Sequence, residues 1–218
     1  MKRLLPGILF IIISFTLLLA GCGGDSDDAA SWITVFEDNF NRSDSDLGSN
    51  YNLKIESGTT FQIESQEVKY YNESSGTGGD CAFYTGFINN PNTRLSIRFT
   101  TGSDLNFDPI ALNARSFDSS GITGYCLALI PSMLIIAKDD GIFLNTQSLS
   151  SIATNTTYIL EFIIEGSSLT GYIKTTGGDI IAEISTSDST SSSGYMGFST
   201  EGSIGTTVYF DDFKIEIR

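Results

Sequence analysis

The sequence predicts an all-β fold, a two-sheet antiparallel sandwich, over residues 32–218. Three observations support this prediction. Apolar and polar residues alternate in short runs, of which Arg94–Phe99 is the clearest. Turn-forming Gly, Ser, Asn and Asp separate these runs at short intervals. No stretch beyond residue 31 shows a sustained helical period, and no second domain boundary is visible.

The pattern predicts about 12 to 14 short strands. The first is Trp32–Phe40, and a polar loop rich in turn formers follows it as far as Tyr51. The other strands are expected at 61–64, 67–71, 81–88, 94–99, 110–117, 124–131, 134–138, 141–144, 158–165, 169–173, 180–184, 195–200 and 207–217. Asp139-Asp140-Gly141 is the strongest hairpin signal, and Ser185–Ser193 is expected to be a loop.

The charge balance excludes one class of partner. Residues 1–21 hold two of the 12 basic residues and none of the 26 acidic ones, so their removal would change the net charge from −14 to −16. Such a surface repels phosphate backbones, and nucleic acid is therefore not an expected partner. The chain also contains no histidine, which removes the commonest general base and metal ligand.

The amino-terminal segment has the layout of a secretory signal. Lys2 and Arg3 precede an apolar run from Leu4 to Ala20, and Leu19-Ala20-Gly21-Cys22 closes it. These last four residues resemble the lipobox of bacterial lipoproteins. The resemblance implies cleavage before Cys22, a diacylglyceryl group on its thiol, and a fatty acid such as palmitate on the new amino terminus. An ordinary signal peptide and a transmembrane anchor are the alternatives, and the run is short for a spanning helix.

This reading divides the chain into a signal peptide (1–21), a lipidated cysteine with a flexible tether (22–31) and one domain (32–218). The residue after Cys22 is Gly23 and not Asp. By the same resemblance, the protein is expected to be anchored in the outer membrane or at the cell surface.

The two remaining cysteines are Cys81 and Cys126. An even pair in an exported protein favours a disulfide, here between two strands. Two separate buried thiols are the alternative.

Three segments of the predicted domain, taken in order, resemble the concanavalin A-like lectin/glucanase superfamily, in particular its laminin G-like and sugar-hydrolase-associated bacterial domains. They are residues 36–42 with 47–51, residues 158–162 with 166–171, and residues 194–198 with 208–215. Tyr51 stands where the family frequently has Trp. The resemblance implies a jelly-roll sandwich in which the first and last strands lie side by side.

That adjacency brings two acidic pairs together. Glu37 and Asp38 of the first strand would approach Asp211 and Asp212 of the last, and grouped carboxylates suit Ca²⁺. Relatives often hold a structural calcium at these places. The alternative is that all four acids face solvent or cap turns. Strand parity turns Asp211 toward the core unless a bulge intervenes, and an inward carboxylate requires a partner.

An enzyme is not expected. Related glucanases carry two glutamates four residues apart with an aspartate between them, whereas Glu161 and Glu165 have Ile163 in the middle position. Retaining glycosidases need two carboxyl groups about 5–5.5 Å apart. We therefore expect Glu161 and Glu165 to lie on the wet face of a strand.

A binding function is the remaining class. A jelly roll that binds sugar needs aromatic faces to stack on rings and polar groups to orient hydroxyls. The candidate ligand contacts are Tyr70, Tyr71, Tyr84, Arg115 and Tyr125. The sequence thus predicts a membrane-anchored extracytoplasmic lipoprotein that recognises carbohydrate. A protein-interaction or structural module of the cell envelope is the alternative, and a glycoside hydrolase is the weakest reading.

Overall fold

The computed structural model describes residues 31–55, 58–72, 79–102, 109–117, 123–139, 141–150, 152–201 and 207–218. Trp32–Arg218 forms one compact unit. The signal sequence, Cys22 and the tether as far as residue 30 lie outside the described residues, as does the predicted turn at 119–121. Within the described ranges, no helix has the length and apolar character needed to cross a membrane.

The described residues form fifteen strands, which confirms the all-β prediction. They are β1 (Ile33–Asp38), β2 (Tyr51–Lys54), β3 (Thr59–Glu64), β4 (Glu67–Asn72), β5 (Asp80–Tyr84), β6 (Asn92–Thr100), β7 (Ile110–Ser116), β8 (Tyr125–Ile130), β9 (Met133–Lys138), β10 (Ile142–Ser148), β11 (Thr157–Glu165), β12 (Ser168–Thr175), β13 (Ile180–Ser187), β14 (Tyr195–Thr200) and β15 (Thr207–Ile217). The short strand β2 was not predicted, because its four residues follow a long polar stretch.

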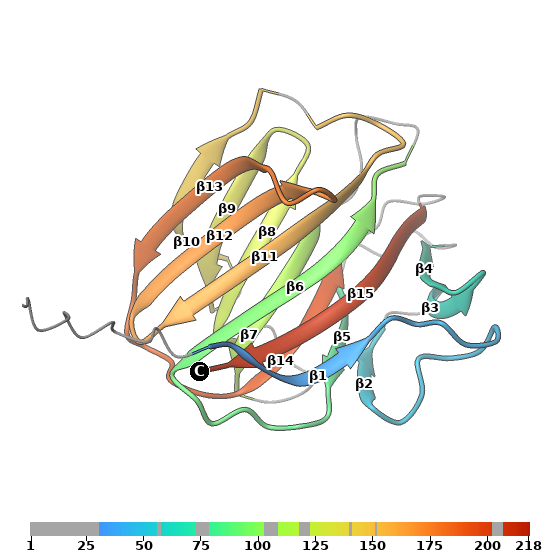
Figure 1. The fold of residues 1–218 in the computed structure, drawn as a ribbon, viewed down its shortest axis with the longest axis horizontal. Helices are drawn as coiled ribbons and strands as arrows, with labels where there is room; N and C mark the ends of the chain where they lie inside the picture. The colour runs from blue at the N-terminus through green and yellow to red at the C-terminus, as the bar shows by residue number, and fades with distance from the viewer. Residues whose placement is uncertain are drawn as a thin grey trace, which may run out of the picture. The chain divides into compact units, whose positions relative to one another are not determined.

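The strands form two antiparallel sheets that lie face to face (Figure 1). The first sheet has the order β13-β12-β11-β6-β15-β4-β3, and β1 pairs with β15. The second sheet has the order β10-β9-β8-β7-β14-β5-β2. The first and last strands are therefore neighbours, as the resemblance implied.

A bulge in β15 decides which of its residues face the core. The register with β6 shifts between Asp211 and Lys214, and Asp212 has a positive φ of 47°. The extra residue reverses the side-chain alternation. Phe210 and Phe213 are consequently both buried, while Asp211 points away from the core. The sequence predicts an inward Asp211 unless a bulge intervenes, and the structure has such a bulge.

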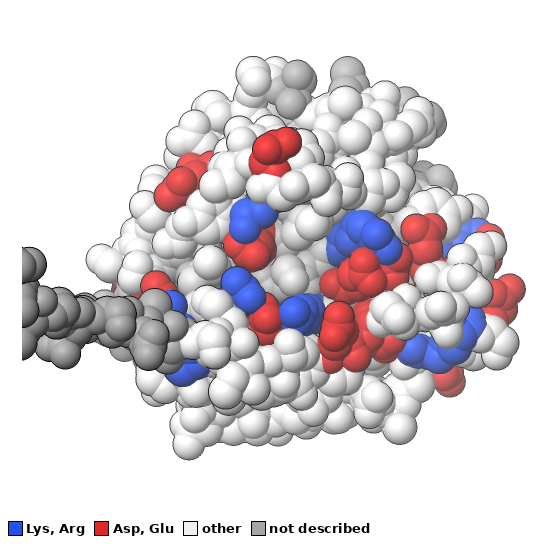
Figure 2. Space-filling model, in the orientation of Figure 1, with Lys and Arg blue, Asp and Glu red and all other residues white. Residues whose placement is uncertain are grey.

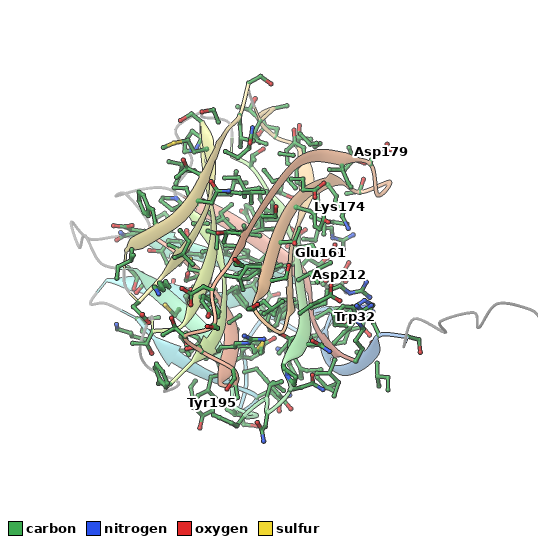
Figure 3. The ribbon with its side chains drawn as sticks, turned by 90° about the vertical axis from the view of Figure 1, so that its left-hand side faces the viewer. Trp32, Glu161, Lys174, Asp179, Tyr195 and Asp212 are labelled. Atoms are coloured by element: carbon green, nitrogen blue, oxygen red, sulfur yellow. The ribbon has the colours of Figure 1, made fainter. Side chains whose placement is uncertain are left out.

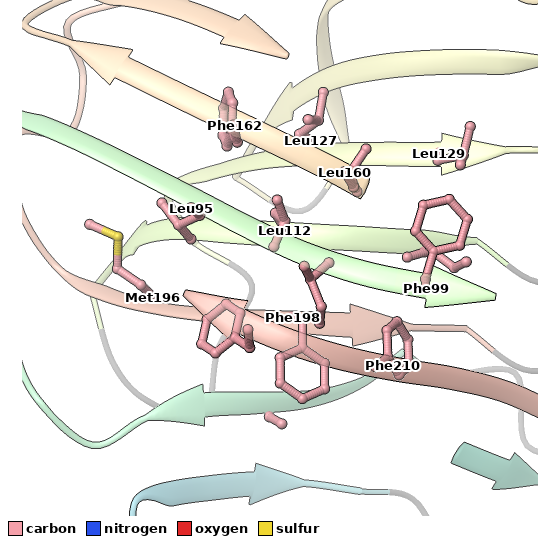
Figure 4. Packing of buried hydrophobic residues seen from close by; sticks show 14 of the residues in the cluster. Leu95, Phe99, Leu112, Leu127, Leu129, Leu160, Phe162, Met196, Phe198 and Phe210 are labelled. Carbon is pink, nitrogen blue, oxygen red and sulfur yellow. The ribbon is translucent and has the colours of Figure 1, made fainter. Parts of the chain in front are cut away.

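The core between the sheets is apolar and rich in aromatic rings (Figure 4). Phe198 of β14 lies at the centre of one group. Its ring centroid is 5.2–6.4 Å from those of Phe40, Tyr51, Phe61, Phe210 and Phe213. Burial of each such side chain stabilises the fold by about 1.5–3 kcal/mol relative to its exposure. The same packing fixes the outward residues of both sheets, since neighbours on a strand alternate between faces.

Candidate functional site

The outer face of the first sheet is charged, and many of its charges form ion pairs. Figure 2 shows basic and acidic side chains side by side over β6, β11, β12 and β15. Arg94 contacts Glu216 at 2.5 Å, and Arg98 pairs with both Asp211 and Asp212. Paired charges of this kind suit a solvated surface and contribute little stability each.

Glu161 and Glu165, which have the spacing of the two glutamates in related glucanases, belong to this face. Glu161 forms an ion pair with Lys174, and Glu165 forms one with Arg218. Glu161, Lys174 and Asp212 lie on the same outer side of the sandwich in Figure 3. Glu161 and Glu165 therefore occupy the wet face, as predicted, and each carboxylate is held by a cation.

The outer face of the second sheet has a different composition. Leu112 and Ala114 of β7 belong to the core. Because neighbours on a strand alternate between faces, Ala111 and Asn113 point outward. The pairing registers place small or apolar residues beside these two on the neighbouring strands. One row is Ala137, Cys126, Asn113 and Gly197, and the next is Ile135, Ala128, Ala111 and Ser199. We call these eight residues the small-residue floor.

Larger side chains stand at the ends of the floor. Phe143 of β10 is opposite Ala137, and Phe83 of β5 is opposite Gly197. Continued past Ser199, the second row passes through Cys81 of β5 and reaches Lys54 of β2. Lys54 is the charged residue of these two rows among the described residues. The floor is therefore uncharged over four strands, in contrast to the outer face of the first sheet.

A hollow of about 190 Å³ opens above one end of the floor. It is lined by Gly124, Tyr125, Cys126, Ala128, Ile135, Ala137, Lys138, Asp139, Gly141 and Phe143. The ring of Phe143 is 63% exposed at its rim. Ligand pockets for drug-sized molecules occupy about 300–1,000 Å³, so this hollow suits one ring-sized group.

Asn113 is the one amide in the floor, and its hydrogen bonding is incomplete. The residue is 1% exposed. Its Nδ2 donates to Oγ of Ser199 at 2.8 Å, whereas its Oδ1 has no hydrogen-bond partner among the described residues. A buried acceptor left without a partner costs about 1–3 kcal/mol. Asn113 is therefore an unsatisfied polar group on a face that is otherwise apolar or small.

Arg115 is a second buried polar side chain, and it lies at one end of the sandwich. The guanidinium of Arg115 donates to three backbone carbonyls, those of Pro91 (2.6 Å), Gly166 (3.1 Å) and Ser191 (2.6 Å). Pro91 and Gly166 flank strands of the first sheet, whereas Arg115 lies on β7 of the second. Arg115 has a positive φ of 57°, and burial lowers its pKa. This side chain therefore joins the two sheets.

Tyr125 and Lys138 fasten the loop after β13. The hydroxyl of Tyr125 donates to Oδ1 of Asp188 at 2.7 Å, and Nζ of Lys138 lies 2.7 Å from Oδ2. The hydrogen bond from Lys138, with others from Thr190 and Tyr125, holds the pKa of Asp188 well below its usual range. This network borders the hollow, because Tyr125 and Lys138 also line it.

The predicted ligand contacts differ in their surroundings. Tyr70 and Arg115 are 0–1% exposed and have internal partners, so they offer no surface contact. Tyr125 is 1% exposed and bonded to Asp188, but it lines the hollow. Tyr70 donates to Oδ2 of Asp80 at 2.7 Å. Tyr71 and Tyr84 are half-buried and lie on different sheets, and Tyr84 stacks on Phe36 with 4.1 Å between centroids. The five residues do not converge on one site.

Sequence reasoning missed Phe143, the exposed ring of the hollow. It also did not consider Asn113, although alternation within Ala111-Leu112-Asn113-Ala114 was an available signal for its outward direction. The order of strands in the second sheet, which makes Asn113 and Ser199 neighbours, was not available from the sequence.

The four acids of the predicted calcium site are not gathered. Asp38 lies on the inward side of β1, where it accepts hydrogen bonds from Arg42 (2.7 Å), Tyr51 (3.2 Å) and the backbone of Phe40 (2.9 Å). Glu37 is exposed on the opposite side. Burial and the nearby carboxylates of Asp211 and Glu37 raise the pKa of Asp212. The described residues contain no group of three or more acids or thiols arranged to hold a metal ion.

The predicted disulfide is absent. Cys81 and Cys126 are free thiols, as in the alternative prediction, but only Cys81 is fully buried and Cys126 is partly exposed. Cys81 is on β5 and Cys126 on β8, and β14 and β7 lie between these strands. Three strand spacings amount to about 14 Å, whereas a disulfide requires Cα atoms less than about 7 Å apart. Burial raises the pKa of Cys81 to about 11 and that of Cys126 to about 12.

Comparison with protein-family models and with curated proteins gives no match. Solved structures do resemble this chain. The carbohydrate-binding module CBM66 from Bacillus subtilis has a TM-score of 0.60 at 15% identity, over 77% of this chain and 95% of the module. Basic winged bean lectin with Tn-antigen has a TM-score of 0.64 at 11% identity, over 85% and 98%.

The exoplasmic/lumenal domain of VIP36 in its Ca²⁺/Man-bound form has a TM-score of 0.59 at 12% identity, over 76% of this chain and 82% of that domain. At these identities the likeness concerns the fold. The chain is an all-β, two-sheet sandwich with the jelly-roll architecture of lectins and carbohydrate-binding modules.

Proposed function

We propose that this protein is a lipid-anchored extracytoplasmic lipoprotein that recognises carbohydrate through the outer face of its second sheet. The observation that carries the proposal is the contrast between the two outer faces. The first is covered by paired charges. The second combines an uncharged floor with an exposed aromatic ring beside a ring-sized hollow.

Carbohydrates match this surface chemically. A sugar ring offers a C–H face that stacks on an aromatic side chain, and Phe143 is the exposed aromatic of the hollow. Its hydroxyls need a few placed polar groups. Lys138 and Asp139, which line the hollow, supply polar groups there. Residues without long side chains leave room for a ligand over Cys126 and Ala137.

The comparisons support the same class of ligand by analogy. A carbohydrate-binding module, a lectin with Tn-antigen and a mannose-bound domain share the fold. Because a fold hosts many functions, the ligand class rests on the site and not on the fold.

The anchoring part of the proposal rests on Leu19-Ala20-Gly21-Cys22. It is tested by growth with labelled palmitate. Label is expected in the wild-type protein and absent from the Cys22→Ser variant, and membrane fractionation should place the wild-type protein in the outer membrane. Labelling that survives Cys22→Ser would overturn this assignment.

Sugar recognition is tested by a glycan array with the full-length protein. At least one glycan is expected to bind, and Phe143→Ala is expected to weaken it at least tenfold. The matched control is Phe87→Ala, because Phe87 is an exposed ring outside the hollow. A protein that binds no glycan, or equal losses in the two variants, would overturn the proposal and favour a protein partner instead.

A further inference from the structure

We infer that the end of the sandwich that carries Ile33, Phe87 and Phe117 contacts the bilayer in which the protein is anchored. We call these three residues, with Trp32 and Tyr195, the membrane-contact surface. The inference rests on the lipid anchor of the proposed function and goes beyond it, because it gives the folded domain its own contact with lipid.

The membrane-contact surface presents large apolar side chains to solvent. Phe117 is 64% exposed, Ile33 62% and Phe87 54%. Among the exposed large hydrophobic residues described, the three most exposed are Phe117, Phe143 and Ile33. Phe143 belongs to the hollow and lies farther along the second sheet, opposite Ala137. The other two are therefore exposed apolar groups that the proposed sugar site does not use.

Phe87 and Phe117 are brought together by β14. The ring of Phe87 packs on that of Tyr195, with 5.4 Å between the centroids. Tyr195 pairs with Ser116, and Phe117 is the next residue along the chain. Apolar groups that gather on a surface mark a contact with a partner or a membrane, whereas single exposed ones do not.

Ile33 lies at the same end of the sandwich. It pairs with Ile217, which is beside the start of β6. The carbonyl of Pro91, just before β6, accepts a 2.6 Å hydrogen bond from Arg115, two residues before Phe117. The start of β1 and the end of β7 are therefore close to the same edge of the two sheets.

The length of the tether selects the membrane as the partner. Cys22 and Trp32 are ten residues apart, and ten residues span at most about 33–36 Å when fully extended. A lipid on Cys22 therefore keeps the end with Trp32 near the bilayer. The guanidinium groups of Arg94 and Arg218 lie 5.0 and 4.9 Å from the centroid of the Trp32 ring. An aromatic ring with polar neighbours suits the boundary between lipid and water.

The charges at this end allow contact with lipid that has no net charge. Glu216 is paired with Arg94, and Glu165 with Arg218. The chain as a whole has a net charge of −14, which repels an anionic surface. The contact is therefore apolar in origin, and phosphatidylcholine is the appropriate probe.

Tryptophan fluorescence tests the inference. Trp32 is the only tryptophan of the sequence, so Trp32→Phe removes the native signal. In this background, Phe117→Trp reports on the membrane-contact surface. Ile180→Trp is the matched control, because Ile180 is 56% exposed and follows Asp179, which lies at the opposite end of the sandwich from Tyr195 (Figure 3).

The full-length lipidated protein is reconstituted into phosphatidylcholine vesicles with brominated acyl chains, which quench tryptophan on contact. We expect at least threefold stronger quenching at position 117 than at position 180. Phe87→Trp is a second reporter with the same expectation. Phe87→Ser, added to the reporter at position 117, is expected to reduce its quenching at least twofold, whereas Phe143→Ala should leave it unchanged.

Flotation of the vesicles separates this inference from the anchor. If the protein floats with the vesicles but positions 87, 117 and 180 are quenched equally, the membrane contact is refuted and the anchor stands. If the protein neither floats nor incorporates palmitate, the anchor is refuted and the contact with it. Glycan binding on the array is measured without vesicles and is independent of both outcomes.

Discussion

The hydroxyl of Tyr125 on β8 donates a 2.7 Å hydrogen bond to the Oδ1 carboxylate oxygen of Asp188, in the loop that follows β13 of the opposite sheet. The same hydroxyl accepts a hydrogen bond from the backbone of Ser191 at 3.2 Å. One phenol therefore holds two points of the 188–194 loop. The hollow beside it is shaped by this attachment, because Tyr125 is one of its lining residues.

Replacement of Tyr125 by Phe removes the hydrogen bonds of the hydroxyl with Asp188 and Ser191 and keeps the ring. Asp188 is a charged acceptor, for which the net value of a hydrogen bond is about 1.5–3 kcal/mol. We expect a loss of about 2 kcal/mol in the free energy of unfolding, measured with urea. Tyr195→Phe is the matched control, since its hydroxyl has no hydrogen bond among the described residues. Equal losses in the two variants would contradict the assignment.

Asp188 makes stability depend on acid pH. Its pKa is lower in the folded protein than the ordinary value of about 3.9. A lowered carboxyl pKa contributes stability that is present above the ordinary value and is lost as the pH falls toward the folded value. Asp188→Asn is therefore expected to flatten the fall in stability below about pH 4, measured by urea unfolding across pH. Asp179→Asn, in the exposed turn before β13, should leave the wild-type slope unchanged.

Gly194 is irreplaceable for steric reasons. A Cβ at this position would lie 2.4 Å from the carbonyl oxygen of Ser116 and from the backbone carbon of Arg115, and its φ is 153°. We expect Gly194→Ala to destabilise the protein by about 2 kcal/mol or more, measured by thermal and urea unfolding. Gly141→Ala is the control, because Gly141 also has a positive φ but has open space around its Cβ position. A control loss as large as that of Gly194→Ala would rule out the contact as the cause.

Asp38 is expected to act through Arg42 and Tyr51 and not through a metal ion. Asp38→Asn removes the ion pair with Arg42, and we expect a loss of about 1–2 kcal/mol in the free energy of unfolding. The loss should be the same with added calcium and with a chelator. A stabilisation by calcium that Asp38→Asn abolishes would restore the metal site predicted from the sequence.

The local pattern of the sequence predicted the strands except β2. The predictions that failed concerned residues far apart in the sequence. Alternation in Arg94–Phe99 identified a half-buried strand, and the structure has β6 there with that burial pattern. By contrast, the Cys81–Cys126 pair looked like a disulfide until the strand order placed β14 and β7 between the two residues. Counting cysteines gives no distance between them.

The candidate site was less predictable than the fold for a related reason. Tyr70 and Tyr125 were predicted as aromatic ligand contacts. Both side chains are buried, and their hydroxyls donate to Asp80 and Asp188. Asn113 looked like an ordinary strand residue. The pairing of β7 with β8 and β14 gives its Nδ2 a partner, while its Oδ1 has none among the described residues.

The pairing of β1 with β15 has a practical consequence. Ile33 lies opposite Ile217, so the two ends of the domain are directly adjacent. Adjacent ends permit circular permutation. A short linker from Arg218 to Trp32, with new ends opened in the exposed β12–β13 turn at Gly177-Gly178, should yield a permuted domain with the same sheets. Such a domain could be carried as an insertion in a loop of another protein.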